Sequence, residues 1–176
     1  MWLSFWLYAE ECASYNKLDD QTRLPSKEGG SWNALGKRPK QHCDSMSQGV
    51  TQPGFDAGKY CLRSPDWKGK GWYRFTAGPK GRVAFKSELP VFSYSANYQY
   101  KWTNPCTTYY GGYLDGGMSS LPTRLGETKK GTVRFIGRDH VQHNNYYDLK
   151  IRITKCPSFL VFELPDTPDS QRYCAA

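Results

Sequence analysis

The segment GKGWYRFTAGPKGRV, residues 69–83, contains the pattern that decides the fold class. Within it, WYRF alternates its side chains between two faces, as a β-strand does, with Trp72 and Arg74 on one face and Tyr73 and Phe75 on the other. We interpret these four residues as a structural motif and expect Arg74 to be ion-paired or stacked on an aromatic ring.

A hairpin is predicted next to this strand. The turn-forming segment TAGPKG (76–81) separates WYRF from a second short run, RVAF (82–85), which suits two strands joined by a longer loop. Two further runs, YQYKW (98–102) and TVRFI (132–136), are also expected to be strands.

The C-terminal third has the clearest strand signals. LKIRITKC (149–156) predicts an inward face of Leu149, Ile151 and Ile153 and an outward face of Lys150, Arg152 and Thr154. SFLVFEL (158–164) is apolar on both faces, which predicts a central strand.

Length and composition agree with these patterns. A chain of 176 residues suits one domain, and 17 glycines and 11 prolines interrupt it throughout. Residues 12–58 read as loop-rich, and 13 tyrosines, 8 phenylalanines and 6 tryptophans supply much of the buriable area. We predict a mainly β fold, a small disulfide-bonded antiparallel β domain that is sandwich-like and has long loops.

The cysteines indicate the compartment. There are six, widely spaced, and none lies in a C-x-x-C pair, which argues against zinc and thioredoxin-type chemistry. Such spacing favours long-range disulfides and hence a secreted, extracellular protein; free thiols in a cytosolic protein are the alternative. The six are Cys12, Cys43, Cys61, Cys106, Cys156 and Cys174.

Charge and hydropathy restrict the partners. A formal charge of +8 attracts anions in general, but the basic residues are scattered without a run of five like charges, so no nucleic-acid partner is predicted. No apolar stretch reaches the ~18 residues that a membrane span needs. Residues 1–11 contain a short apolar run that we interpret as a signal-peptide remnant or a first strand. The folded domain is expected at 12–176, either alone or as part of a larger multidomain chain.

Few residues suggest catalysis or metal binding. His140 and His143 lie in a polar segment without further ligands, and His42 adjoins a cysteine expected to be in a disulfide, so no metal is predicted. Asp19 and Asp20 are adjacent and would point apart on a strand, which does not suit general acid–base chemistry. No phosphate-binding, dinucleotide-binding or nucleophile-elbow motif occurs. We therefore expect a non-catalytic protein without a cofactor.

The candidate binding surface is TTYYGGYLDGG, residues 107–117. Tyr109, Tyr110 and Tyr113 stand among glycines and could stack on sugar rings, and Asp115 could accept hydroxyl hydrogen bonds; the alternative is that these tyrosines cover a thin core. The expected partner is an extracellular protein or a glycan.

Four blocks occur in a specific order: CASYNKLDDQTR (12–23), CD leading to GWYRFTAGPKGRV (43–83), CTTYYGGYLDGG (106–117), and LKIRITKCPSFLVFELPDTPDSQRYC (149–174). Together they resemble the eight-cysteine, or decoy, extracellular domain of the uromodulin and pancreatic granule glycoprotein 2 type. This resemblance covers nearly the whole chain from residue 12 and implies a secreted, cysteine-rich β module.

The chain departs from the family pattern in its cysteines. The resemblance implies the pairs Cys12–Cys156 and Cys106–Cys174. It leaves Cys43 without its family partner, for which Cys61 would substitute, although sequence alone allows fifteen pairings. Family cysteines are replaced at Arg134, Asn144, Asn145 and Asp169, and one is absent near Ser87.

The family's recognised role does not carry over. Uromodulin-like modules display an N-linked glycan that captures bacterial adhesins, which requires N-x-S/T, and no asparagine here is followed two residues later by serine or threonine. No glycosylation is expected. We predict a non-catalytic extracellular binding or matrix module. The alternatives are a lectin-like carbohydrate-binding module in innate defence and, third, a small secreted enzyme.

Overall fold

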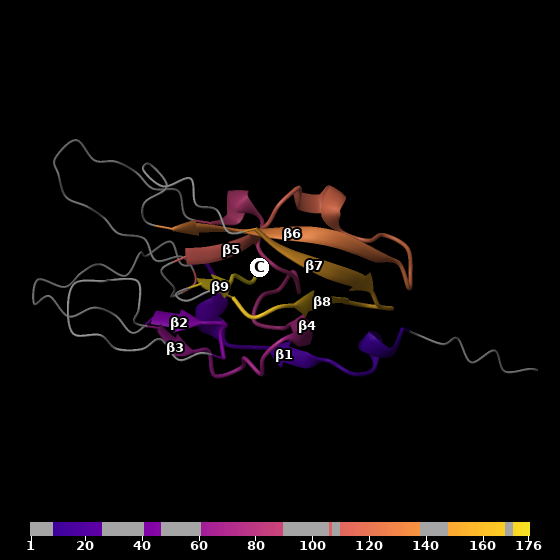
Figure 1. The fold of residues 1–176 in the computed structure, drawn as a ribbon. Helices are drawn as coiled ribbons and strands as arrows, with labels where there is room; N and C mark the ends of the chain where they lie inside the picture. The colour runs from indigo at the N-terminus through magenta and orange to yellow at the C-terminus, as the bar shows by residue number, and fades with distance from the viewer. Residues whose placement is uncertain are drawn as a thin grey trace, which may run out of the picture.

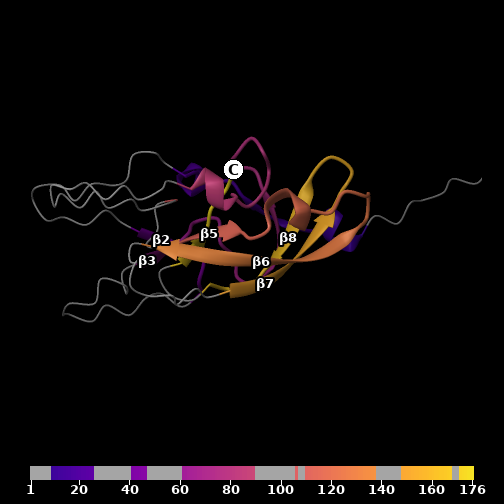
Figure 2. The same cartoon turned by 90° about the horizontal axis from the view of Figure 1, so that it is seen from above.

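The computed structural model describes residues 9–25, 41–46, 61–89, 106, 110–137, 148–167 and 171–176. In this part of the chain, seven strands form one sheet in the order β1-β4-β8-β7-β6-β5-β9, and two form a small sheet, β2-β3. Figure 1 shows the large sheet curling from β6 and β7 round to β4 and β1, and Figure 2 shows it from above. The strands are β1 (Asn16–Leu18), β2 (Gln41–Cys43), β3 (Cys61–Arg63), β4 (Gly71–Phe75), β5 (Tyr110–Leu114), β6 (Thr128–Gly137), β7 (Asp148–Lys155), β8 (Leu160–Leu164) and β9 (Gln171–Tyr173).

The centre of the large sheet is antiparallel and its edges are parallel. Strands β4, β8, β7, β6 and β5 pair antiparallel in turn, whereas β1 joins β4 and β9 joins β5 in parallel. Short 3₁₀ turns supply the helical content: η1 (Glu10–Cys12), η2 (Gln21–Arg23), η3 (Lys86–Glu88) and η5 (Gly117–Ser120). The predicted mainly β, disulfide-bonded fold is confirmed, in the form of one curled sheet that closes over its own core.

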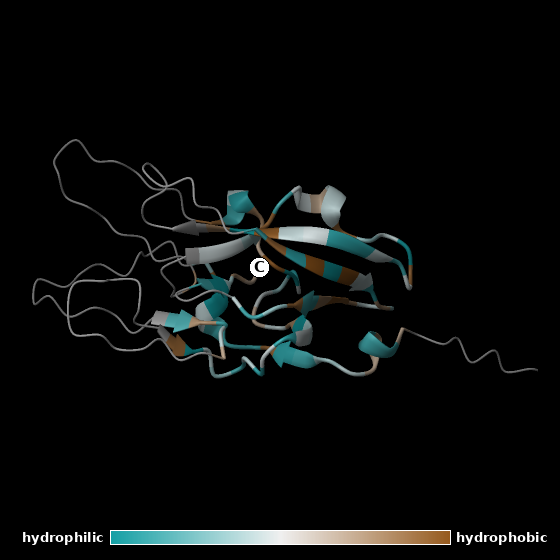
Figure 3. Ribbon diagram, viewed as in Figure 1, coloured by the Kyte–Doolittle hydropathy of each residue, from teal (hydrophilic) through white to brown (hydrophobic). Residues whose placement is uncertain are grey.

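Strand β7 has the predicted alternation. Ile151 and Ile153 are buried, Lys150 and Arg152 are exposed, and Figure 3 shows apolar and polar bands alternating along the strand. Thr154 is the exception. It lies on the outward face but is fully buried, because its hydroxyl donates a hydrogen bond of 2.8 Å to Glu11 of η1. Strand β8 is interior, between β4 and β7, as its two apolar faces predicted.

The motif in β4 also has its predicted faces. Tyr73 and Phe75 are buried, whereas Trp72 and Arg74 are half-buried. The Arg74 guanidinium lies 4.1 Å from the centroid of the Phe159 ring, which confirms the predicted stacking of this arginine on an aromatic side chain.

The predicted hairpin at 72–85 is wrong. Strand β4 pairs with β1 and β8, and within the described ranges residues 82–85 make two isolated bridges, from Val83 to Ala175 and from Phe85 to Leu114. The reason is that β8 is apolar on both faces and occupies the edge of β4 that the hairpin would need. Residues 82–85 instead pack inside the curl of the sheet.

The core fills the concave side of the sheet. It combines inward side chains of β4, β6, β7 and β8 with Trp67, Leu114 and the C-terminal residues Tyr173 and Ala175. Gly112 in β5 allows the closest approach, since a Cβ there would lie 2.7 Å from the Phe135 ring and 3.1 Å from the backbone oxygen of residue 172.

Two disulfides match the expected pairs. Cys12–Cys156 and Cys106–Cys174 have Cα–Cα distances of 5.7 and 5.5 Å. Cys43 is also disulfide-bonded. Its strand, β2, pairs with the strand that begins at Cys61, but the Cys61 side chain is not among the described ones, so this third pair stays a prediction.

Some expectations fall outside the described ranges. Residues 1–8 and the YQYKW segment (98–102) are not described, so the first-strand and strand interpretations there are untested. Within the residues that are described, no helix is long and apolar enough to cross a membrane.

Candidate functional site

A buried arginine organises the end of the molecule near the small sheet. The Arg23 side chain is fully buried, and its Nη1 and Nη2 donate to the two carboxylate oxygens of Asp44 at 2.7 and 2.8 Å. Its Nε and Nη2 donate to Asp66 at 2.8 and 2.5 Å. Two carboxylates therefore take the guanidinium in paired, fork-like contacts, the strongest geometry that such groups form.

The same carboxylates also bind backbone groups. Asp44 accepts a hydrogen bond of 2.9 Å from the amide of Tyr173, and Asp66 accepts one of 3.1 Å from the amide of Asp20. Arg23 further donates to the carbonyl oxygen of Tyr173 at 3.1 Å. This arginine network, Arg23 with Asp44 and Asp66, joins η2, β9 and the segments after β2 and β3.

A second buried arginine extends the cluster. Arg172 donates to Asp20 at 2.8 Å, to the hydroxyl of Thr22 at 2.9 Å and to the carbonyl oxygen of Cys106 at 3.0 Å. Its Nε is buried and has no hydrogen-bond partner among the described residues. Arg172 therefore fixes the backbone beside the Cys106–Cys174 disulfide.

The arginine network shifts the pKa of its members. Burial alone would raise the pKa of Asp66, but the hydrogen bonds and charge of Arg23 outweigh it and hold that pKa below its ordinary value. Burial and the nearby Arg23 lower the pKa of Arg172. Asp66 therefore stays ionised, as a buried counter-ion must.

The loop after β3 is fixed by aromatic side chains. The Trp67 indole stacks on the Tyr73 ring at 4.7 Å, and its Nε1 donates to Asp166 at 2.8 Å. The Tyr73 hydroxyl donates to the Gly69 carbonyl oxygen at 2.6 Å and accepts from the amide of Lys68 at 2.9 Å. Burial is the main cause that raises the pKa of Tyr73 to about 12.

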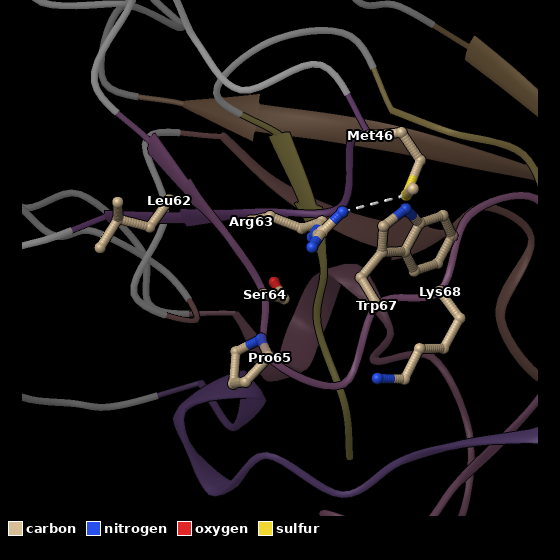
Figure 4. Close-up of a pocket in the computed structure, with 7 residues that line it drawn as sticks. All are labelled: Met46, Leu62, Arg63, Ser64, Pro65, Trp67 and Lys68. Atoms are coloured by element: carbon tan, nitrogen blue, oxygen red, sulfur yellow. Dashed lines mark hydrogen bonds between the residues drawn. The ribbon is translucent and has the colours of Figure 1, made fainter.

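An open pocket of about 460 Å³ lies over this loop. Its lining includes the exposed apolar side chains of Met46, Leu62 and Pro65, of which Met46 and Leu62 are 47% and 52% exposed. Arg63 points toward the Met46 thioether, with Nη1 and Sδ 3.7 Å apart, and the Trp67 indole lies beside them in Figure 4. The lining residues are Met46, Leu62, Arg63, Ser64, Pro65, Trp67 and Lys68.

The acids of the arginine network are close in sequence to the residues that line this pocket. Asp44 precedes Met46 by two residues, and Asp66 lies between the lining residues Pro65 and Trp67. The amide and hydroxyl of Ser64 both donate to the Cys43 carbonyl oxygen, at 2.8 and 3.2 Å. The pocket is thus an apolar and cationic surface whose backbone is fixed by hydrogen bonds and by the neighbouring arginine network. Such a rigid support is suited to binding.

The predicted tyrosine surface is not exposed where it can be described. Tyr113 is 4% exposed and packs with Ala84, Leu89, Cys106 and Cys174, so its ring is not available for stacking on a ligand. The interpretation of Tyr113 as a surface contact is wrong, because β5 directs it into this second cluster.

The other members of that segment give no assembled site. Tyr109 and the side chain of Tyr110 lie outside the described part of the chain. Asp115 is half-buried and forms an ion pair with Arg134, whose Nε lies 3.5 Å from Asp115 and 3.2 Å from Asp148.

Histidines do not assemble a metal site among the residues described, which contain no cluster of three or more histidine, cysteine, aspartate or glutamate side chains. His140 and His143 fall in the undescribed range 138–147. His42 is half-buried, and burial and then the charge of Arg172 lower its pKa.

Sequence reasoning missed the network and the pocket. Asp44 and Asp66 are single acids in loop-like segments, with no periodicity to indicate that both meet Arg23. The available signal was indirect: the CD dipeptide and the arginines of DQTR and SQRYC all lie in blocks that carry the family resemblance.

Comparison with known proteins gave no match: no family model, no curated protein and no solved structure is similar to the chain.

Proposed function

We propose that this protein is a non-catalytic, secreted binding module of the uromodulin-like eight-cysteine type, and that the pocket over Trp67 receives a segment of an extracellular protein. The observation that carries this proposal is the composition of the pocket. Apolar side chains and two cations, Arg63 and Lys68, line it, and the described lining residues include no carboxylate.

The lining has the chemistry of a protein-recognition surface. Met46 is unbranched and polarisable, so it adapts to different partner shapes, and arginine and methionine are both enriched in protein interfaces. A ligand that places an apolar side chain on Met46 and Pro65 and a carboxylate near Arg63 would satisfy both parts of the surface. The pocket volume is in the range of roughly 300–1,000 Å³ that ligand sites occupy.

Two uncharged polar groups of the pocket form hydrogen bonds within the fold. The Ser64 hydroxyl is buried and donates to a backbone carbonyl oxygen, and the Trp67 Nε1 donates to Asp166. Neither is placed to act as a nucleophile with an adjacent base, which supports binding as the role of this surface.

The disulfides support an extracellular location. Cys12–Cys156 joins residues 144 apart in sequence and Cys106–Cys174 joins residues 68 apart, and long-range bonds of this kind persist in oxidising compartments. Titration of the native protein with a thiol reagent should find no reactive sulfhydryl. Six reactive sulfhydryls in a cooperatively folding protein would contradict both the location and the family proposal.

Binding is tested with immobilised extended peptides that each carry one acidic and one apolar residue at varied spacing. We expect wild-type protein to bind a subset of them. The double variant Met46→Ser with Arg63→Glu should weaken this binding at least about tenfold, as loss of an interface hot spot does. The matched control is Met118→Ser with Arg124→Glu, since both residues are exposed and belong to neither the pocket nor the network. Equal loss in the two variants, or no peptide bound by wild type, would refute the proposal.

A further inference from the structure

The convex face of the large sheet carries a compact group of cations. Lys130 of β6 lies directly opposite Arg152 of β7 in the antiparallel register, and Lys150 lies two residues from Arg152 on the same face. All three are exposed. Neighbouring strands are about 4.8 Å apart, and residues on the same face of one strand are about 7 Å apart. The three positive groups therefore lie close enough together to contact one or two sugar units of the same chain.

These cations, which we call the basic triad (Lys130, Lys150 and Arg152), are incompletely neutralised. Arg152 binds Glu163 through Nε alone, at 2.5 Å. Lys150 donates to the hydroxyl of Thr132 at 3.0 Å. Glu163 and the nearby Glu11 both act on Arg152, and Asp148, two residues from Lys150 on the same face, is bound by Arg134. Among the described residues, Lys130 and Lys150 form no ion pair with a carboxylate.

The surroundings of the triad suit a carbohydrate chain. The Thr132 and Thr128 hydroxyls lie on the same face of β6, and the half-buried Trp72 ring lies 5.4 Å from the Arg152 guanidinium. Hydroxyls and an aromatic ring match the polar edges and apolar C–H faces of sugars.

The same surroundings do not suit a membrane surface. The exposed large apolar side chains of the described residues are Met46, Leu62, Met118 and Leu125, and none lies on β4, β6, β7 or β8. Binding to the bilayer interface needs apolar groups beside the basic ones.

We propose that the basic triad binds a sulfated polysaccharide. Sulfate groups along such a chain meet Lys130, Arg152 and Lys150, and the ring of Trp72 and the threonine hydroxyls contact the sugar. This surface is separate from the pocket over Trp67, so it adds a second ligand to the proposed binding module. It also returns to the carbohydrate-binding alternative with different residues from the tyrosines first considered.

The test uses the intact protein on immobilised heparin, with chemically desulfated heparin as the reference ligand. We expect wild type to bind heparin at physiological salt and to lose most of this binding on the desulfated chain. The variant Lys130→Glu with Lys150→Glu should bind heparin roughly tenfold more weakly, because it removes two attractions and adds two repulsions.

The control separates the triad from net charge. Lys86→Glu with Arg124→Glu lowers the formal charge from +8 to +4 (two changes of −2 each), as the triad variant does, at exposed basic residues outside this face and outside the pocket. Retained heparin binding in this control supports the triad. Equal weakening in both variants, unchanged binding in the triad variant, or binding to phosphatidylserine vesicles instead of heparin overturns the proposal. Circular dichroism melting of each variant excludes unfolding as the cause. Peptide binding at the pocket, measured on the triad variant, should stay unchanged, so the two proposals fail separately.

Discussion

Two groups of ion pairs with similar distances lie at different depths in this molecule. In the arginine network, Arg23 meets Asp44 and Asp66 at 2.7 and 2.5 Å, with side chains 0%, 0% and 4% exposed. On the convex face, Arg152 meets Glu163 at 2.5 Å, with side chains 52% and 26% exposed. Distance alone does not tell the two apart.

Depth decides what each pair does. Water and salt screen the surface pair, and its members lose little when separated. The buried carboxylates have no water to replace Arg23, so the fold must keep all three groups together. Two other pairs lie between these limits. Arg172 and Asp20 are 0% and 14% exposed, and Arg82 and Glu88 are 8% and 19% exposed. The comparison predicts that the loss of stability on breaking a pair becomes smaller as the exposure of its members rises.

The largest effect is expected at Arg23. Arg23→Met leaves Asp44 and Asp66 buried without their cation, and we expect a loss of about 3–5 kcal/mol in the free energy of unfolding. Urea denaturation followed by tryptophan fluorescence measures it. A loss as small as that of the surface variant Arg152→Met would contradict the idea that burial makes the Arg23 ion pairs essential to stability.

Arg172→Met should have the second largest effect, about 2–3 kcal/mol. The change strands the carbonyl oxygen of Cys106, but Asp20 is partly exposed and can turn to water, which limits the loss. The same denaturation experiment applies, with Thr22→Val as a control that keeps the contacts of Arg172 with Asp20 and Cys106 and removes the hydrogen bonds of the Thr22 hydroxyl to Arg172 and Asp20. A loss larger than that of Arg23→Met would show that contacts near the Cys106–Cys174 disulfide, and not the burial of charge, determine the size of these losses in stability.

Local patterns account for the part of the fold that could be predicted from the sequence. Alternation within β4 and β7 and the double apolar face of β8 depend on neighbouring residues, so they are visible in one short window. The predicted hairpin at 72–85 was wrong because it assumed that strands adjacent in sequence pair with each other. Strand β4 pairs instead with β8, whose residues lie about ninety positions further along the chain.

The candidate site could not be predicted in this way. Arg23 meets partners 21, 43 and 150 residues away in sequence, and no period links them. The sequence assigned no acid–base role to Asp20, and it gave no sign of the contact with Arg172, 152 residues away, which depends on β9 adding to the far edge of the sheet. Ion pairs between residues so far apart in sequence depend on the order of the strands in the sheet, and that order cannot be read from the sequence alone.

Intermediate depth predicts a pH effect at Glu88. Hydrogen bonds from Arg82 lower its pKa from 4.5 to about 2. The lowered pKa means that the pair stabilises the folded state fully above pH about 4.5, and that this contribution is lost as the pH falls from about 4.5 to about 2. Glu88→Gln should lose about 1–2 kcal/mol at pH 7, within the ceiling of about 3 kcal/mol that the pKa shift allows. Unfolding measured from pH 7 to pH 2 should show the wild-type and variant curves converging in that window; a constant gap would contradict the assignment to ionised Glu88.

The smallest effect is expected at Arg152. Arg152→Met should cost less stability than any of the other variants, because its half-buried partner Glu163 reaches water when the pair is broken. The methionine also keeps an unbranched side chain beside Trp72, so packing changes little. The decisive measurement is the salt dependence: the small difference between wild type and variant should vanish at 1 M sodium chloride, where charges are screened beyond about 3 Å, whereas the loss in Arg23→Met should persist. If the two losses respond to salt alike, then burial does not distinguish the two groups of ion pairs. In that case the arginine network supports the pocket over Trp67 no more firmly than the surface pair supports the convex face.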